Sequence, residues 1–293
     1  MLTKEQFHTK IAQGIHFLDG ATGSNLRKMG MPNHVCTEQW VLSNPEKLIC
    51  LQRQFAQAGT QILYAPTFQA QPIALEKVGL HRHCEQINAQ LVALSRSAAP
   101  ECLIAGDLTT LAAFTESWNG DNFDLLVDNY RRQIRGLVDG GADLLVAETL
   151  MYPLEAEAIL AASEMEQATA VMFSFTMMSD GSLYSGEEAA PVLRDLEEAG
   201  AVAVGFNCVT ADMMTPYLVT KLRRHVKGPL LCKPNAGIPK IDENGIAQYD
   251  MTEDTFAQVL QECYDNGATL LGGCCGATPE HMAAMIQQLK KKI

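Results

Sequence analysis

Short apolar runs recur along the chain, and longer amphipathic segments separate them. The runs are rich in Val, Ile, Leu or Ala and are flanked by Gly or Pro. Runs without polar alternation are typical of strands buried on both faces, as in a parallel sheet. We therefore predict eight strands, at residues 14–18, 62–65, 102–105, 143–147, 170–175, 202–206, 229–232 and 269–271.

The intervening segments predict helices, and residues 45–58 are the clearest example. Pro45 suits the first turn, Ser43 or Asn44 suits the N-cap, and Gly59 suits the C-terminal cap. The same order of helix, glycine and apolar strand returns at Gly140-Gly141, at Gly200 and at Gly267. One turn chemistry at four helix-to-strand joints indicates repeated βα units.

The number and spacing of the strands favour a closed barrel. From Ile15 to Leu270 the predicted strands are about 36 residues apart, which suits βα repeats. An open doubly wound sheet would place a Gly-rich phosphate loop after its first strand, and residues 19–23 match that loop only in part. No linker-like stretch divides the chain, so we predict a single-domain (β/α)8 TIM barrel over residues 1–293.

Composition excludes several classes of protein. Of the 293 residues, 47% are hydrophobic and 19% are charged, which excludes a disordered chain. The net charge of −12 argues against nucleic acid as a partner. No apolar run approaches the roughly 18 residues of a membrane span, and the N-terminus lacks the apolar stretch of a signal peptide. We expect a cytoplasmic protein without a membrane partner, whose nine cysteines form no disulfide framework.

Polar or reactive residues follow most of the predicted strands. Each alone is also an ordinary turn residue. In barrels, however, chemistry is located at the C-terminal ends of the strands, so we expect these residues to share one pocket. The set includes Asp19, Gly20, Ala21, Thr67, Asp107, Glu148, Asn207, Cys208, Lys233, Asn235, Cys274 and Cys275.

Cys208, Cys274 and Cys275 are the most specific members of this set. They follow the sixth and eighth predicted strands, which are near neighbours in a barrel, so three thiolates can converge on one metal ion. Zinc binds thiolates in a tetrahedron, and a catalytic zinc keeps one position open. Buried free thiols or a vicinal disulfide remain alternatives. We expect the other six cysteines to lie in the core or on the surface, and residues 81–84 to form a solvated helix end rather than a metal site.

The motifs around these residues resemble those of zinc-dependent homocysteine S-methyltransferases. This family includes the homocysteine-binding module of cobalamin-dependent methionine synthase, betaine–homocysteine methyltransferase and the S-methylmethionine enzymes. The resemblance covers residues 10–290. The matching segments are Leu-Asp-Gly-Ala-Thr-Gly at 18–23, Pro-Thr-Phe at 66–68, Glu-Thr at 148–149, Gly-Phe-Asn-Cys at 205–208, Pro-Asn-Ala-Gly at 234–237 and Gly-Gly-Cys-Cys-Gly at 272–276.

The resemblance implies a barrel that carries one zinc ion and transfers a methyl group to the thiolate of homocysteine, giving methionine. It implies that Asp19 and Glu148 hold the substrate ammonium, and that backbone N–H groups near Gly20 and Ala21 hold its carboxylate. It assigns Thr67 and Asn207 to the pocket walls. We also expect Asn235 to supply an oxygen to zinc before homocysteine binds.

The methyl donor remains open at this stage. The chain ends soon after its eighth βα unit, so we expect it not to hold methylfolate or cobalamin as the further modules of methionine synthase do. The candidates are a methylated corrinoid protein, S-methylmethionine and a betaine. Ser24 and Gln69 depart from the family pattern near the pocket. Alternatives are a methyltransferase for a different thiol, a redox switch at the cysteine pair, and a non-catalytic homocysteine- or zinc-binding partner of a corrinoid protein.

Overall fold

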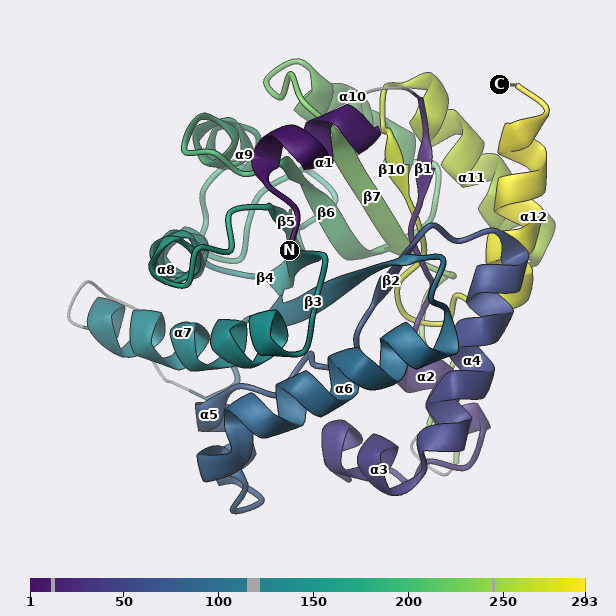
Figure 1. Cartoon of the computed structure of the whole chain (residues 1–293). Coiled ribbons are helices and arrows are strands. Elements are labelled where there is room, and N and C mark those ends of the chain that lie inside the picture. Colours follow the sequence, from purple (N-terminus) through teal and green to yellow (C-terminus); the bar gives the residue numbers. More distant parts are fainter. Residues whose placement is uncertain (12–13, 115–121, 244–245, 293) are drawn as a thin grey trace.

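Eight parallel strands form the centre of the molecule. The computed structural model describes residues 1–11, 14–114, 122–243 and 246–292. The strands are β1 (His16–Phe17), β2 (Ile62–Tyr64), β3 (Leu103–Thr109), β4 (Leu144–Leu150), β5 (Val171–Phe175), β6 (Ala203–Thr210), β7 (Leu230–Asn235) and β10 (Leu270–Leu271). Their order is β1-β10-β7-β6-β5-β4-β3-β2, and a bridge between Leu18 and Ile62 brings the first strand beside the second. The predicted (β/α)8 TIM barrel is confirmed (Figure 1).

One long helix follows each barrel strand, and these helices surround the sheet (Figure 1). They are α4 (Pro45–Ala58), α6 (Cys84–Ala98), α7 (Phe123–Asp139), α8 (Pro153–Met165), α9 (Ala189–Glu198), α10 (Thr215–Arg223), α11 (Glu253–Asp265) and α12 (Pro279–Lys290). The connections also carry α2 (Gly23–Lys28), α3 (Thr37–Ser43), α5 (Pro72–Glu76) and a 3-10 turn at His81–His83. Within the described ranges, no helix has the length and apolar character needed to cross a membrane.

The core has an outer and an inner layer. The outer layer packs the helices against the sheet. The inner layer fills the barrel with side chains such as Ile62, Val146 and Leu231, and helix α1 (Lys4–Ile11) adds Phe7 to it. Figure 1 shows α1, in purple, lying across one end of the barrel. This end is therefore closed by apolar packing.

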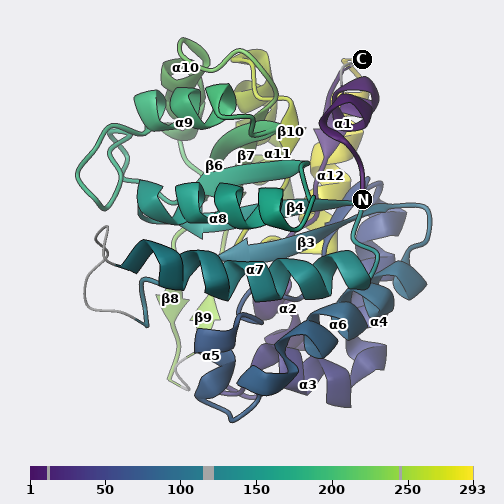
Figure 2. The same cartoon turned by 60° about the vertical axis from the view of Figure 1, so that its left-hand side comes forward.

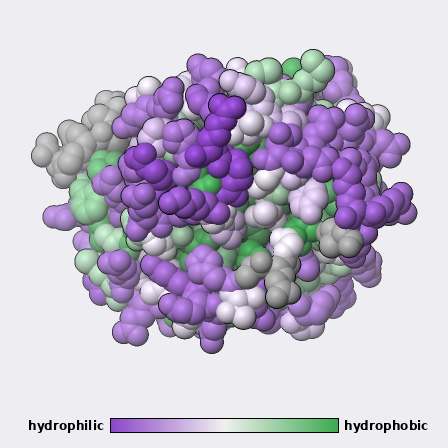
Figure 3. Space-filling model, turned by 90° about the horizontal axis from the view of Figure 1, so that it is seen from above, coloured by the Kyte–Doolittle hydropathy of each residue, from purple (hydrophilic) through white to green (hydrophobic). Residues whose placement is uncertain are grey.

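The opposite end of the barrel carries the long connections. A small antiparallel hairpin, β8 (Lys240–Ile241) with β9 (Ala247–Gln248), extends from the segment after β7. Figure 2 shows the hairpin at the end away from α1 and both termini. Seen from above, the molecule presents a mostly hydrophilic surface with small hydrophobic groups (Figure 3).

The predicted turn chemistry is confirmed at the helix ends. Helix α4 spans Pro45–Ala58, and Gly59 caps it in the left-handed region, at φ +106°. The glycines at the three equivalent joints, Gly141, Gly200 and Gly267, also have positive φ. Glycine adopts this conformation without steric strain, so each helix can reverse directly into a strand.

The predicted strand ends were wrong in one consistent way. Strands β3, β4, β6 and β7 continue through the polar residues that we expected to lie in loops, namely Asp107, Glu148, Cys208 and Asn235. The apolar pattern stops where the barrel interior meets the cavity, whereas the hydrogen bonding between strands continues past that point. The candidate residues are therefore held by the sheet itself.

The cysteines outside the candidate site behave as expected. None of the nine is in a disulfide, and Cys84, Cys102, Cys232 and Cys263 are buried. Cys36 is half-buried and Cys50 is exposed. Residues 81–83 form a 3-10 turn with no buried residue, as predicted for a solvated helix end, whereas Cys84, the last residue of that predicted segment, is buried at the start of α6.

Candidate functional site

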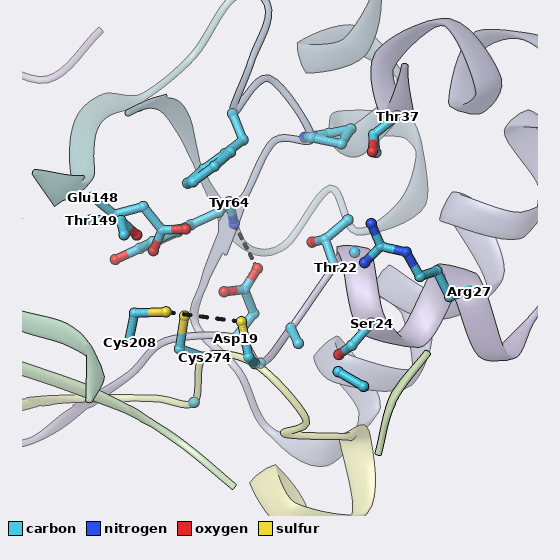
Figure 4. Close-up of a pocket in the computed structure, with 18 of the residues that line it drawn as sticks. Asp19, Thr22, Ser24, Arg27, Thr37, Tyr64, Glu148, Thr149, Cys208 and Cys274 are labelled. Atoms are coloured by element: carbon cyan, nitrogen blue, oxygen red, sulfur yellow. Dashed lines mark hydrogen bonds between the residues drawn. The ribbon is translucent and has the colours of Figure 1, made fainter. Parts of the chain in front are cut away.

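A cavity of about 500 Å³ opens at the end of the barrel opposite α1. Its lining comes from the strand ends, from the segment after β1 and from the β8–β9 hairpin. Among the predicted residues, its wall includes Asp19, Gly20, Ala21, Glu148, Cys208, Cys274 and Cys275. The close-up in Figure 4 shows the side chains of Asp19, Glu148, Cys208 and Cys274 pointing toward one space. The size is typical of a small-molecule site.

Three cysteines meet at one side of this cavity. The sulfur atoms of Cys208, Cys274 and Cys275 all lie within 4.8 Å of one another, and the Cys208 and Cys275 sulfurs are 3.9 Å apart. Sulfurs bound to zinc at about 2.3 Å in a tetrahedron are about 3.8 Å apart. Hydrogen bonds from Cys208 and Cys274 lower the pKa of Cys275. Hydrogen bonds with Cys274 and Cys275 raise the pKa of Cys208, and the pKa of Cys274 is raised as well, so the three thiols share a single favoured thiolate. The donor set fits one thiophilic metal ion.

Unusual backbone positions the first of these cysteines. Cys208 has φ +59°, in the left-handed region that non-glycine residues rarely adopt. It lies where the register between β6 and β7 shifts, between Asn207 and Thr210. Such irregularities redirect side chains and concentrate near functional sites. The strained backbone at Cys208 therefore directs its sulfur atom into the cavity.

The cysteine pair depends on the glycine that follows it. Gly276 has φ +82°, and a Cβ atom there would lie 2.3 Å from Cγ of Tyr249. No side chain fits at that distance, so only glycine allows the chain to turn beneath the Tyr249 ring. Both cysteines thereby face the cavity from one tight bend.

Asn235 adds an oxygen atom whose bonding is unsatisfied. Its Nδ2 donates to the carbonyl of Cys208 at 3.1 Å, while its buried Oδ1 has no hydrogen-bond partner among the described residues. Buried polar atoms normally have a partner. An unpartnered oxygen on a side chain that contacts the backbone of Cys208 is compatible with a further metal ligand. The residues present therefore fit a zinc site.

A buried ion pair forms the floor of the cavity. The Lys233 Nζ lies 2.9 Å from Asp19 Oδ1 and 3.8 Å from Glu148 Oε2. It also lies 3.6 Å from the centre of the Tyr64 ring. The other oxygen of Asp19 accepts the backbone N–H of Tyr64 at 2.8 Å. Asp19 thus has both oxygens engaged, whereas Glu148 has only long contacts.

Burial controls the protonation of these groups. It raises the pKa of Glu148 to about 8, and it also raises the pKa of Asp19. For Asp107, burial and then the neighbouring Glu148 raise the pKa well above its usual range. Burial alone would lower the pKa of Lys233, but Asp19 and Glu148 outweigh it and raise that pKa well above normal. Perturbed groups of this kind that converge on one cavity mark a functional site.

Two predicted residues lie behind the wall rather than in it. Thr67 is fully buried, and its hydroxyl donates to the carbonyl of Asp107 at 2.9 Å. Asn207 is also fully buried; its Oδ1 accepts the Thr149 N–H at 2.8 Å and its Nδ2 lies 3.5 Å from Glu148. Neither belongs to the cavity lining. Each of them forms a hydrogen bond to a residue that does line the cavity, Thr67 to Asp107 and Asn207 to Thr149.

The backbone N–H groups of Gly20 and Ala21, which were predicted to bind a carboxylate, differ in their hydrogen bonding. The Ala21 N–H donates to the carbonyl of Ala277 at 3.0 Å. Within the described part of the chain, the Gly20 N–H makes no hydrogen bond. Gly20 also packs tightly, because a Cβ there would lie 2.7 Å from the carbonyl oxygen of Ala277. Of the two predicted amides, the described residues therefore leave only that of Gly20 without a partner.

Sequence reasoning placed Lys233 among the residues that follow the seventh predicted strand but gave it no role, and it missed Tyr64 and Tyr249. All three line the cavity. Lys233 had a signal, because it is the one charged residue in the apolar strand segment 229–234. Tyr64 lies inside an apolar run and Tyr249 lies in the hairpin connection, so neither differs from ordinary core or loop residues in the sequence.

Comparisons with known proteins agree with this geometry. The Escherichia coli homocysteine methyltransferase MmuM, in its metallated form, shares 25% identity and a TM-score of 0.80, over 94% of this chain and 96% of that one. Its oxidized form gives 25% and 0.79, over 96% and 97%. The carboxyl transferase domain of Rhizobium etli pyruvate carboxylase shares only the fold, at 13% identity and a TM-score of 0.53, over 99% and 52%. Residues 16–289 match the family described as homocysteine S-methyltransferase, and the chain belongs to that family.

Proposed function

We propose that the protein transfers a methyl group to the sulfur of homocysteine, giving methionine, with one zinc ion held by Cys208, Cys274 and Cys275. The observation that carries this proposal is the convergence of the three sulfurs within 4.8 Å at the wall of the cavity. Membership of the homocysteine S-methyltransferase family supports the acceptor. The metallated form of the E. coli relative supports a metal at this site.

The cysteines supply the binding chemistry for the metal. A free thiol has a pKa near 8.5, so only a small fraction is thiolate at neutral pH. Zinc bound there would lower the pKa of a coordinated thiol and keep an open position for it. Because three cysteinates make the site electron-rich, the acceptor sulfur keeps its nucleophilic character.

The remaining lining orients the acceptor. Glu148 lies at the cavity wall with no close hydrogen bond, so its carboxyl group can receive the substrate ammonium, whose positive charge favours the ionised carboxylate. The Gly20 N–H can receive the carboxylate. Anchoring both ends of the amino acid leaves the sulfur directed at the cysteine cluster, where it attacks the methyl carbon as the donor's bond to that carbon breaks. The acceptor thiol gives up its proton to solvent before the attack.

The donor must carry a leaving group that is already activated, such as a sulfonium, a quaternary ammonium or a methylated corrinoid. A cavity of about 500 Å³ exceeds a single small amino acid and leaves room for the donor's methyl-bearing part. Large apolar side chains are exposed on the connections after β5, β6 and β7; they include Met178, Tyr184, Met213, Tyr217, Ile238 and Ile241. Of these, Ile241 lines the cavity, and exposed apolar groups on the connections at this end of the barrel favour a donor carried by another protein.

Metal analysis and a donor panel test the proposal. We expect about one zinc per chain, and methionine formation from homocysteine with at least one of S-methylmethionine, S-adenosylmethionine, betaine or methylcobalamin. Cys208→Ala should lose both metal and activity, whereas Cys50→Ala, which changes an exposed cysteine, should lose neither. Full activity of the metal-free protein would contradict the mechanism. Zinc and homocysteine binding without transfer from any donor, protein-borne corrinoids included, would favour the non-catalytic alternative.

A further inference from the structure

The carboxyl groups buried in the cavity wall differ in how far the protein itself binds their oxygens. In the described part of the chain they belong to Asp19, Glu38, Asp107 and Glu148. Asp19 has one oxygen 2.9 Å from Lys233 and accepts the Tyr64 N–H at 2.8 Å on the other. Glu38 accepts the Gln69 N–H at 2.8 Å and, on its other oxygen, a thiol at 3.3 Å. These two groups are therefore fully engaged.

The other two carboxyl groups, those of Asp107 and Glu148, lack such partners. Asp107 is only 4% exposed, and its buried Oδ1 accepts no hydrogen bond within the described ranges. Glu148 has only long contacts, 3.8 Å to Lys233 and 3.5 Å to the Asn207 amide. A buried polar group without a partner costs free energy, so such groups are rare. A ligand that supplied the missing partner would remove this cost.

Neighbouring strands bring Asp107 and Glu148 to the same cavity. Ala105 on β3 and Val146 on the adjacent strand β4 belong to the inner apolar cluster. Asp107 and Glu148 each follow two residues later, and alternate residues of a strand point to the same face. Both carboxyl groups therefore point inward, just beyond the apolar cluster, where they line the cavity. The Thr67 hydroxyl contacts the backbone N–H and carbonyl of Asp107 but not its carboxyl group.

The cavity wall supplies too little positive charge for this pair. Burial and then Glu148 raise the pKa of Asp107, and Lys233 offsets this effect only in part. Arg27 and Lys28 also line the cavity, but within the described ranges neither forms an ion pair with either carboxyl group. An ammonium group between the two carboxyl groups would provide the missing charge and favour their ionised forms.

We propose that Asp107 is a specificity-determining residue that binds the ammonium of the acceptor together with Glu148, so that the acceptors are thiols with a free ammonium group. The inference rests on the proposed function, because it concerns the acceptor of the same site. An ammonium has three N–H donors, so two carboxyl groups can share it. The family resemblance assigns this contact to Asp19, whose oxygens are both engaged.

The test compares two thiols on the zinc-loaded protein by titration calorimetry. Homocysteine and 4-mercaptobutyrate have the same sulfur and the same chain length, and only homocysteine carries the ammonium. The ratio of their dissociation constants therefore isolates recognition of that group. For the unmodified protein we expect homocysteine to bind at least about a hundredfold more tightly, and equal binding of the two thiols would overturn the inference.

Two matched variants separate binding of the ammonium from a structural role. Asp107→Asn should lower the preference for homocysteine by about tenfold or more and leave the binding of 4-mercaptobutyrate unchanged. Glu38→Gln, which changes a buried carboxyl group of the same cavity whose oxygens are both engaged, should leave the preference unchanged. An equal loss of both thiols in Asp107→Asn, or the same fall in both variants, would overturn the inference.

If Asp107→Asn fails to fold, Glu148→Gln measures the contribution of Asp107 without changing it. The preference for homocysteine should stay above about tenfold, because Asp107 remains, and a smaller preference would overturn the inference. If neither thiol bound the zinc-loaded protein, the proposed function would fail and the inference with it. Binding of homocysteine with a preference that Asp107→Asn leaves unchanged would overturn the inference alone.

Discussion

The same strands carry apolar side chains toward one end of the barrel and charged side chains toward the other. Inward-facing residues of a strand are two positions apart. On β4, Val146 belongs to the inner apolar cluster and Glu148 to the cavity; on β7, Leu231 and Lys233 repeat the pattern. On both strands, a core residue and a cavity residue are thus only two positions apart. Stability is concentrated at the α1 end and function at the cavity end, as expected for this fold.

The largest loss of activity is expected from a substitution at the cavity end. Cys274→Ser should reduce methyl transfer by more than about a thousandfold, because it removes one of three metal ligands. Stability of the metal-free protein should change little, since Cys274 belongs to neither apolar cluster. Metal analysis, an activity assay and urea denaturation measure the three quantities. Zinc content equal to that of the unmodified protein would count against the assignment.

The matching change at the other end is Phe7→Ala. Phe7 is fully buried where α1 closes the barrel, so its truncation should lower the free energy of unfolding by about 3–5 kcal/mol. Zinc content and activity per folded molecule should stay the same. Urea denaturation and metal analysis test this. Metal loss in a folded Phe7→Ala protein would show that the two ends are not independent.

Asn207→Ala should affect both properties moderately. Its amide accepts the Thr149 N–H and the Ser174 hydroxyl, and it faces Glu148. We expect a loss of about 1–3 kcal/mol in stability and about tenfold weaker homocysteine binding. Ser174→Ala, which removes a single bond to the same oxygen, is the control and should have the smaller effect on binding. An equal effect of both variants would mean that Asn207 only supports the strands.

The smallest effect is expected far from both ends, at Glu166. Hydrogen bonds from Arg135 and then Arg131 lower the pKa of Glu166, so this group adds stability above its unfolded pKa near 4.5 and loses it as the pH falls through the lower folded value. Glu166→Gln should cost at most about 1 kcal/mol at pH 7. Denaturation at pH 7 and pH 3 should show the difference shrinking in acid. A difference that grew in acid would reverse the assigned sign.

The sequence predicted the fold and the metal cluster because both leave patterns in it. Eight apolar runs, with glycines at the joints, indicate a barrel, and adjacent cysteines among glycines are rare enough to be specific. The strand ends could not be predicted, because β6 pairs with β7 at Asn207 and again at Thr210, on either side of the register shift that holds Cys208, after the apolar pattern stops. The Lys233–Asp19 pair joins residues 214 positions apart, and no local pattern reports such a contact.

Counting the sulfur ligands of the bound zinc, by X-ray absorption, tests the central claim most directly. The account predicts three sulfurs in the zinc-loaded protein, from Cys208, Cys274 and Cys275, and four after homocysteine is added. An unchanged count at saturating homocysteine would contradict the claim that the acceptor thiol is brought to this metal site.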